Sequence, residues 1–147
     1  SEKRLRERYN ADLANGLGNL VSRVLALSAR TEVFLENIEK IQVEGELAGT
    51  IKSTQEKYKK SLEEIKFHEA LEVIWQLISA CDEYIEKKKP WALIKTDQNK
   101  FKQVLSELLI TLKEIALLLR PFLPAASEKI LEQIKLNKKT EVLFPRL

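Results

Sequence analysis

Apolar residues between positions 101 and 119 recur every three or four residues, which is the spacing of one face of an α-helix. The positions are Phe101, Val104, Leu105, Leu108, Leu112, Ile115 and Leu119. Because this segment is apolar around much of its circumference, we expect a central helix from near Asp97 to just before Arg120-Pro121. A helix of that kind needs other elements to cover it, so the chain is expected to fold as a bundle.

The rest of the chain also favours helices over strands. Hydrophobic residues make up 44% of it, and it has only 4 Gly and 4 Pro. Four further helices are expected, covering about Glu2–Leu27 (or on towards Ile38), Ser53 or Thr54 to Lys66, His68–Glu86 closed by Pro90, and Pro124–Lys135. Between them, Ile41–Gly49 reads as a loop. We therefore predict an all-α bundle of about five helices, with the apolar ending Phe144-Pro145-Arg146-Leu147 packed back on it.

Length and cysteine content give the setting of this chain. Its 147 residues suit one domain, taken as 1–147. A single cysteine, Cys81, and the lack of a secretory leader make a reducing compartment the default, so a cytoplasmic location is expected. No apolar run reaches the length of a spanning helix, and no membrane partner is expected. Since the chain starts at Ser1, already in a helical pattern and without any Met, we expect it to be part of a longer protein.

The first predicted helix has an unusual polar face. Asn15, Asn19 and Arg23 recur at every fourth residue, opposite an apolar stripe, with Gly16 and Gly18 between them. Glycine costs a helix about 1 kcal/mol and asparagine also weakens it, so stability alone would not favour these residues. Asparagine both donates and accepts hydrogen bonds, arginine offers a planar fork of donors, and glycine lets a planar partner approach the backbone. Such a face is suited to reading the edges of nucleic-acid bases.

A second candidate region follows the third predicted helix, where Lys87, Lys88 and Lys89 precede Pro90 and Trp91. The lysines could simply complement the dipole at a helix end, and Trp91 could be a packing plug in a loop. A solvent-reaching tryptophan beside cations is also what single-stranded RNA needs for stacking. In contrast, Trp75 has core spacing within its helix and is expected to be buried.

Catalytic and metal chemistry find little support. His68 is the only histidine, and no cysteine or second histidine stands at metal spacing from it, so no metal site is expected. His68 is interpreted as a solvated residue at a helix start. Cys81 lies on a largely apolar helix and is interpreted as a buried thiol. The carboxylates are spaced as helix surface without a Gly-rich phosphate loop, so no catalytic residue is proposed.

Four segments together resemble the anticodon-binding domain of methionyl-tRNA synthetase, a class I aminoacyl-tRNA synthetase. They are Arg8-Tyr9-Asn10-Ala11-Asp12-Leu13-Ala14-Asn15-Gly16-Leu17-Gly18-Asn19-Leu20-Val21-Ser22-Arg23, Tyr84-Ile85-Glu86 with Lys89-Pro90-Trp91, Arg120-Pro121-Phe122-Leu123-Pro124 through Ser127-Glu128-Lys129-Ile130, and Leu143-Phe144-Pro145-Arg146-Leu147. They occur in the family's order across nearly the whole chain. The stretch from Arg30 to Gly49 departs from the family pattern, in which a loop richer in aromatic, Gly and Pro residues is expected.

The resemblance implies a tRNA partner with a CAU anticodon. Trp91 would stack on an unpaired base, Asn15 and Asn19 would hydrogen-bond base edges, Arg23 would contact a base or phosphate, and Lys87–Lys89 would attract the RNA backbone. The family's two catalytic signatures, resembling His-Ile-Gly-His and Lys-Met-Ser-Lys-Ser, are absent. No cofactor is therefore expected within 1–147, whereas a longer parent would use ATP and methionine, with any zinc outside this stretch. The parent's catalytic domain is a further expected partner, and DNA is not.

Two alternatives remain at this point. One is the corresponding domain of a valine, leucine or isoleucine synthetase, although the Asn15/Asn19/Arg23 spacing and the Pro90-Trp91 pair argue against it. The other is a helical protein-interaction module in which the same residues form a rim.

Overall fold

The computed structural model describes residues 3–4, 7, 15–31 and 45–136. Within these ranges the chain forms six helices and no strand. The helices are α2 (Gly18–Ser28), α4 (Glu46–Glu63), α5 (Phe67–Lys88), α6 (Pro90–Thr96), α7 (Gln98–Leu119) and α8 (Pro124–Leu136). The all-α prediction is confirmed for this part of the chain. The expected packing of the C-terminal tail, and the positions of Tyr9 and Leu13, lie outside the described residues.

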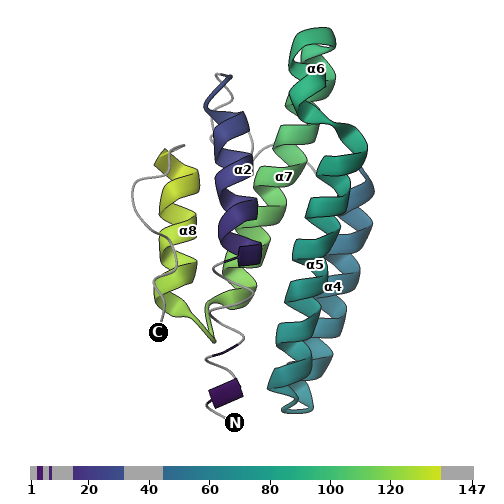
Figure 1. Cartoon of the computed structure of the whole chain (residues 1–147). Helices are drawn as coiled ribbons and strands as arrows, with labels where there is room; N and C mark the ends of the chain where they lie inside the picture. The colour runs from purple at the N-terminus through teal and green to yellow at the C-terminus, as the bar shows by residue number, and fades with distance from the viewer. Residues whose placement is uncertain (1–2, 5–6, 8–14, 32–44, 137–147) are drawn as a thin grey trace.

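Helix α7 is the centre of the bundle, as its apolar pattern predicts. It contacts α2, α4, α5, α6 and α8, and Phe101, Leu105, Leu108, Leu112 and Ile115 on it are fully buried. The carboxylate of Asp97 accepts a hydrogen bond from the backbone N–H of Lys100 at 3.1 Å and so caps the first turn of α7. Helices α4 and α5 form a long antiparallel hairpin on one side of it, while α2 and α8 lie on the other (Figure 1).

The turn between α4 and α5 follows the rules for a helix C-terminus with one exception. The N–H of Lys66 donates to the carbonyl of Ser61 at 2.7 Å, and the N–H of Ile65 donates to that of Leu62 at 3.0 Å. This is a Schellman motif, which needs a left-handed residue at the position of Ile65. Ile65 has φ 58° there, although glycine is the residue usually found. A β-branched side chain in this conformation is strained.

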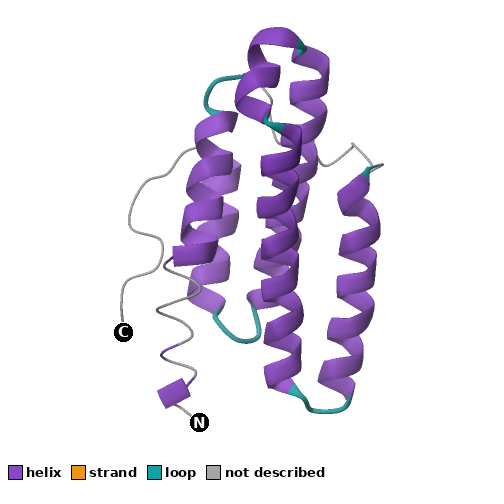
Figure 2. Ribbon diagram, turned by 45° about the vertical axis from the view of Figure 1, so that its right-hand side comes forward, coloured by secondary structure: helices purple, strands orange, loops and turns teal. Residues whose placement is uncertain are grey.

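Two element predictions were wrong. Helix α4 begins at Glu46, not at Ser53 or Thr54, because buried Leu47 gives the extra turns a core contact; Gly45 is its N-cap and Gly49 lies inside the helix. The segment after Pro90 is a short helix, α6, and not a loop, with Pro90 in its first turn. Helices α5, α7 and α8 agree with the predictions to within a few residues, and α2 ends within one residue of the predicted Leu27, whereas residues 8–14 of the first predicted helix lie outside the described residues. Figure 2 shows the short turns that join α4 to α5 and α7 to α8.

Neither a membrane-spanning helix nor a metal-binding cluster occurs in the described part of the chain. None of its helices combines the length and the apolar character needed to cross a bilayer. No group of three or more potential metal ligands comes together among the same residues. His68 is exposed at the start of α5, and Cys81 is fully buried, as predicted.

Candidate nucleic-acid interface

The polar face of the first helix is exposed to solvent. Asn15, Asn19 and Arg23 are all exposed, while Leu17, Leu20 and Val24 face the core. Residues 15–17, which include Asn15, have π-helical geometry and lead into α2. Local π-helical geometry of this kind is frequent at functional sites. The open space at Gly16 points the same way, because a Cβ added there would have no neighbour within 4 Å. Core packing therefore does not explain this glycine.

Arg23 is held by two carboxylates of α5. Its Nη2 donates to Glu86 Oε1 at 3.0 Å, and its Nη1 lies 3.8 Å from Asp82 Oδ1. Burial raises the pKa of Asp82, the Arg23 guanidinium opposes that rise, and the Glu86 carboxylate adds to it. The two acidic residues fix the direction of the guanidinium, so a ligand meets an oriented fork of donors. The Arg23–Glu86 pairing spans 63 positions of sequence and the Arg23–Asp82 pairing 59, and no local pattern indicated them.

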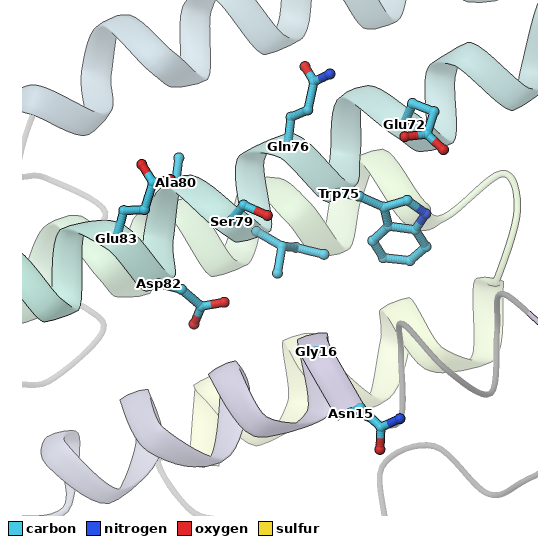
Figure 3. A pocket seen from close by; sticks show the side chains of 10 residues that line it. Asn15, Gly16, Glu72, Trp75, Gln76, Ser79, Ala80, Asp82 and Glu83 are labelled. Carbon is cyan, nitrogen blue, oxygen red and sulfur yellow. The ribbon is translucent and has the colours of Figure 1, made fainter.

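A cavity of about 780 Å³ opens between the start of α2 and the middle of α5. Asn15 and Gly16 form one side of it, and α5 supplies the other; Figure 3 shows the indole of Trp75 and the carboxylate of Asp82 both on the side that faces α2. The lining from α5 consists of Glu72, Trp75, Gln76, Ile78, Ser79, Ala80, Asp82 and Glu83.

This cavity corrects the interpretation of Trp75. The side chain is only partly buried and packs on the edge of the core, where it forms a wall of the cavity. Helical spacing correctly predicted that Trp75 lies on the core side of α5. It could not show that a cavity separates this part of α5 from the start of α2. The acidic side chains Glu72, Asp82 and Glu83 make the cavity unfavourable for phosphate. A flat, uncharged group with amino donors, such as a base, suits it better.

The second candidate region lies where α5 ends. Lys89 adopts a left-handed conformation, with φ 49°, and α6 begins at the next residue. Trp91, in the first turn of α6, is 43% exposed, so the prediction of a solvent-reaching indole is confirmed.

Lys87, Lys88 and Lys89 form the corner between α5 and α6, and they differ in their ion pairs. Lys87 Nζ lies 3.1 Å and Lys88 Nζ 3.3 Å from Glu46 Oε1, and these lysines lower the pKa of Glu46, chiefly through the hydrogen bond from Lys87. Lys88 also lies 5.9 Å from the centroid of the Tyr84 ring. Lys89 is exposed and has no ion pair within the described ranges. Lys89 is therefore the best placed of the three to meet a phosphate.

Sequence comparison identifies the family to which this chain belongs. Residues 36–144 match the family described as the anticodon binding domain of methionyl tRNA ligase. The match covers most of the chain, including Trp91 and the lysines, and begins after Arg23. The chain belongs to this anticodon-binding family.

Relatives of the domain carry the matching name. The methionine–tRNA ligase of Clostridium tetani is 36% identical over 138 residues, which cover 91% of this chain and 22% of the relative. That of Clostridium acetobutylicum is 33% identical over 167 residues, covering 96% and 26%. The anticodon-binding domain thus spans about a quarter of the relatives' length.

Solved structures agree on the fold. The apo form of Mycobacterium tuberculosis methionyl-tRNA synthetase superposes with a TM-score of 0.76 at 24% identity, covering 100% of this chain and 35% of that one. The same enzyme in complex with methionyl-adenylate gives 0.76 at 25% identity, covering 99% and 34%.

Proposed function

We propose that this domain reads the CAU anticodon of methionine tRNA and contributes RNA binding, not catalysis, to a longer methionine–tRNA ligase. The observation that carries the proposal is the uncharged face with exposed Asn15 and Asn19, on which Asn15 and Gly16 border a cavity of about 780 Å³ and which ends at an oriented arginine, Arg23. Bases are read by such donors and acceptors, whereas phosphates are attracted by charge.

Each residue has a distinct part in this proposal. Asn15 and Asn19 hydrogen-bond base edges, and Arg23 presents its donors to a base or to the adjoining phosphate. The exposed face of Trp91 stacks on an unpaired base, a contact that is worth about 1–3 kcal/mol. Lys89, with weaker help from Lys87 and Lys88, attracts the backbone of the loop.

The parent protein would carry the chemistry. By analogy with the ligases it resembles, it would join methionine to tRNA with ATP in the cytoplasm, through a catalytic domain outside 1–147. The family match counts against the valine, leucine and isoleucine alternatives. A protein-interaction module is disfavoured by the low apolar content of the Asn15–Arg23 face.

The test measures discrimination between anticodons. Binding of the chain to a CAU stem-loop and to a one-base variant is measured by calorimetry at several salt concentrations. Asn15→Ala and Asn19→Ala should each lower the preference for CAU by about 1–3 kcal/mol while the slope of log K against log salt stays the same. Gln55→Ala, which removes an exposed amide from α4, is the matched control and should change neither quantity. Unaltered preference in both asparagine variants would refute base reading by this face.

A further inference from the structure

A carboxylate is buried in the middle of the central helix. Glu107 on α7 is only 4% exposed, and its Oε2 accepts a hydrogen bond from the hydroxyl of Tyr84, itself 4% exposed, on α5. Its Oε1 has no hydrogen-bond partner among the residues that the structure describes. Burying a carboxylate costs several kcal/mol, and replacing both partners of a buried hydrogen bond by apolar groups of the same shape can be nearly neutral or stabilising. Stability alone is therefore a weak reason for Glu107 to be there.

The same carboxylate lies against the start of α4. A Cβ added at Gly45, the N-cap of α4, would collide with the end of the Glu107 side chain, so the carboxylate lies close to the backbone at the start of this helix. The positive end of the α4 dipole favours an anion at this place. Glu107 thus joins the start of α4 to the end of α5 from a position on α7.

A second set of contacts closes the same corner from outside. Glu46, the residue after Gly45, pairs with Lys87 and Lys88, and Lys88 lies near the ring of Tyr84. The chain then turns at left-handed Lys89 and buries Pro90 before it presents Trp91. The direction of α6, and with it that of the Trp91 indole, depends on how the last turn of α5 is held.

We propose that Tyr84 and Glu107 are positioning residues for Trp91: their buried hydrogen bond fixes the end of α5 so that the indole faces the RNA. This inference rests on the proposed function. It concerns the orientation of Trp91 and not the stability of the bundle. The effects on orientation and on stability can be separated, because the polar groups of Tyr84 and Glu107 can be removed in one double variant.

The test compares single and double variants for CAU stem-loop affinity and for thermal stability. Tyr84→Phe leaves Glu107 without its donor and should lower both. Tyr84→Phe/Glu107→Leu removes both polar groups, which should return stability close to that of the unaltered chain. Stem-loop affinity should stay about five- to thirtyfold lower in this double variant because base stacking on Trp91 is weakened. Glu107→Gln keeps an acceptor for the Tyr84 hydroxyl and should bind within about twofold of the unaltered chain.

Tyr58→Phe is the matched control. The Tyr58 hydroxyl is also buried and donates to the carbonyl of Leu118 at 2.8 Å, but it lies on α4, away from the corner. Its loss should lower stability without changing affinity. An RNA-independent readout uses the Trp75→Phe background, where Trp91 is the remaining tryptophan: its fluorescence anisotropy should fall in the double variant.

The outcomes separate the two proposals. If the unaltered chain binds both stem-loops equally, the proposed function fails, and the Trp91 anisotropy still decides on positioning. If the unaltered chain prefers CAU but the double variant matches it in affinity and anisotropy, only the positioning role is overturned.

Discussion

Arg23 Nη2 lies 3.0 Å from Glu86 Oε1, so the basic residue of α2 is already directed by its partner on α5 in the unbound domain. Arginine offers a rigid planar fork, and lysine only a point charge. Arg23→Lys should therefore keep the charge but lower the preference for CAU over a one-base variant by about 1–3 kcal/mol. The control is Arg30→Lys, at an exposed site after the end of α2. Equal preference in the two variants would show that Arg23 acts through its charge alone.

The two tryptophans should separate binding from stability. Trp91→Ala should change stability by no more than about 0.5 kcal/mol, as expected for a surface residue, and weaken stem-loop binding by about 1–3 kcal/mol. Trp75 is only partly buried, so Trp75→Ala should cost about 2 kcal/mol of stability, less than a fully buried aromatic residue. Chemical denaturation and calorimetry measure the two effects. A large stability loss in Trp91→Ala would instead identify that indole as a packing plug.

Lysine neutralisation should be unequal along the corner. Lys89→Gln should weaken binding to all stem-loops alike and reduce the salt slope by about one unit. Lys87→Gln and Lys88→Gln should have smaller effects, because Glu46 already neutralises part of their charge. Binding isotherms at four or more salt concentrations give the slopes. Three equal slopes would contradict this ranking.

The strained turn at Ile65 can be relieved. Ile65 is 72% exposed, so its side chain adds little to the core, while its left-handed conformation costs about 1–2 kcal/mol. Ile65→Gly should stabilise the bundle by about 0.5–1 kcal/mol after the greater entropy of glycine in the unfolded chain is offset. Ile65→Ala keeps a Cβ and should give no such gain. Equilibrium denaturation measures both, and equal stabilities would argue against strain at this residue.

The Cys81 thiol should be protected at neutral pH. Burial is the main cause that raises its pKa to about 12, compared with about 8.5 in an unfolded chain. Because the native state keeps its proton longer, Cys81 favours folding fully below about pH 8.5, and this contribution is lost as pH rises towards 12. At pH 8 a thiol reagent should label the native chain only as it unfolds, whereas Cys81→Ala/Ser53→Cys, with an exposed thiol, should react at once. Rapid labelling of native Cys81 would refute this.

Local patterns predicted the elements whose signals are local. The apolar period of α7 and the Pro124 start of α8 were sufficient to place those helices. The sequence does not predict helix α6, because its seven residues are too few to show a helical period. The predicted start of α4 is too late, because Gly45 and Gly49 read as loop residues. The first turns of α4 are held by contacts with other helices, among them the burial of Leu47 in the core and the pairing of Glu46 with Lys87 and Lys88.

The features of the candidate site also differ in whether a local pattern predicts them. The composition of the Asn15–Arg23 face and the position of Trp91 after Pro90 indicated exposed binding residues. The cavity beside Trp75, the Arg23–Glu86 pair and the Tyr84–Glu107 hydrogen bond each join residues on different helices. Such pairings depend on how the helices pack against one another, and this packing cannot be predicted from the local patterns of a single sequence.

One consequence of α5 being a single helix from Phe67 to Lys88 concerns spacing. It carries Trp75 at the cavity and Glu86 beside Arg23, and then leads into the corner that presents Trp91. At 1.5 Å per residue, Trp75 and Glu86 are separated by about 16 Å along a rod that does not stretch. Helix α5 therefore holds the Trp75 and Glu86 positions at a fixed distance from each other. A ligand that contacts both positions must match this fixed interval, and inserting one residue between them would rotate one position by about 100° relative to the other.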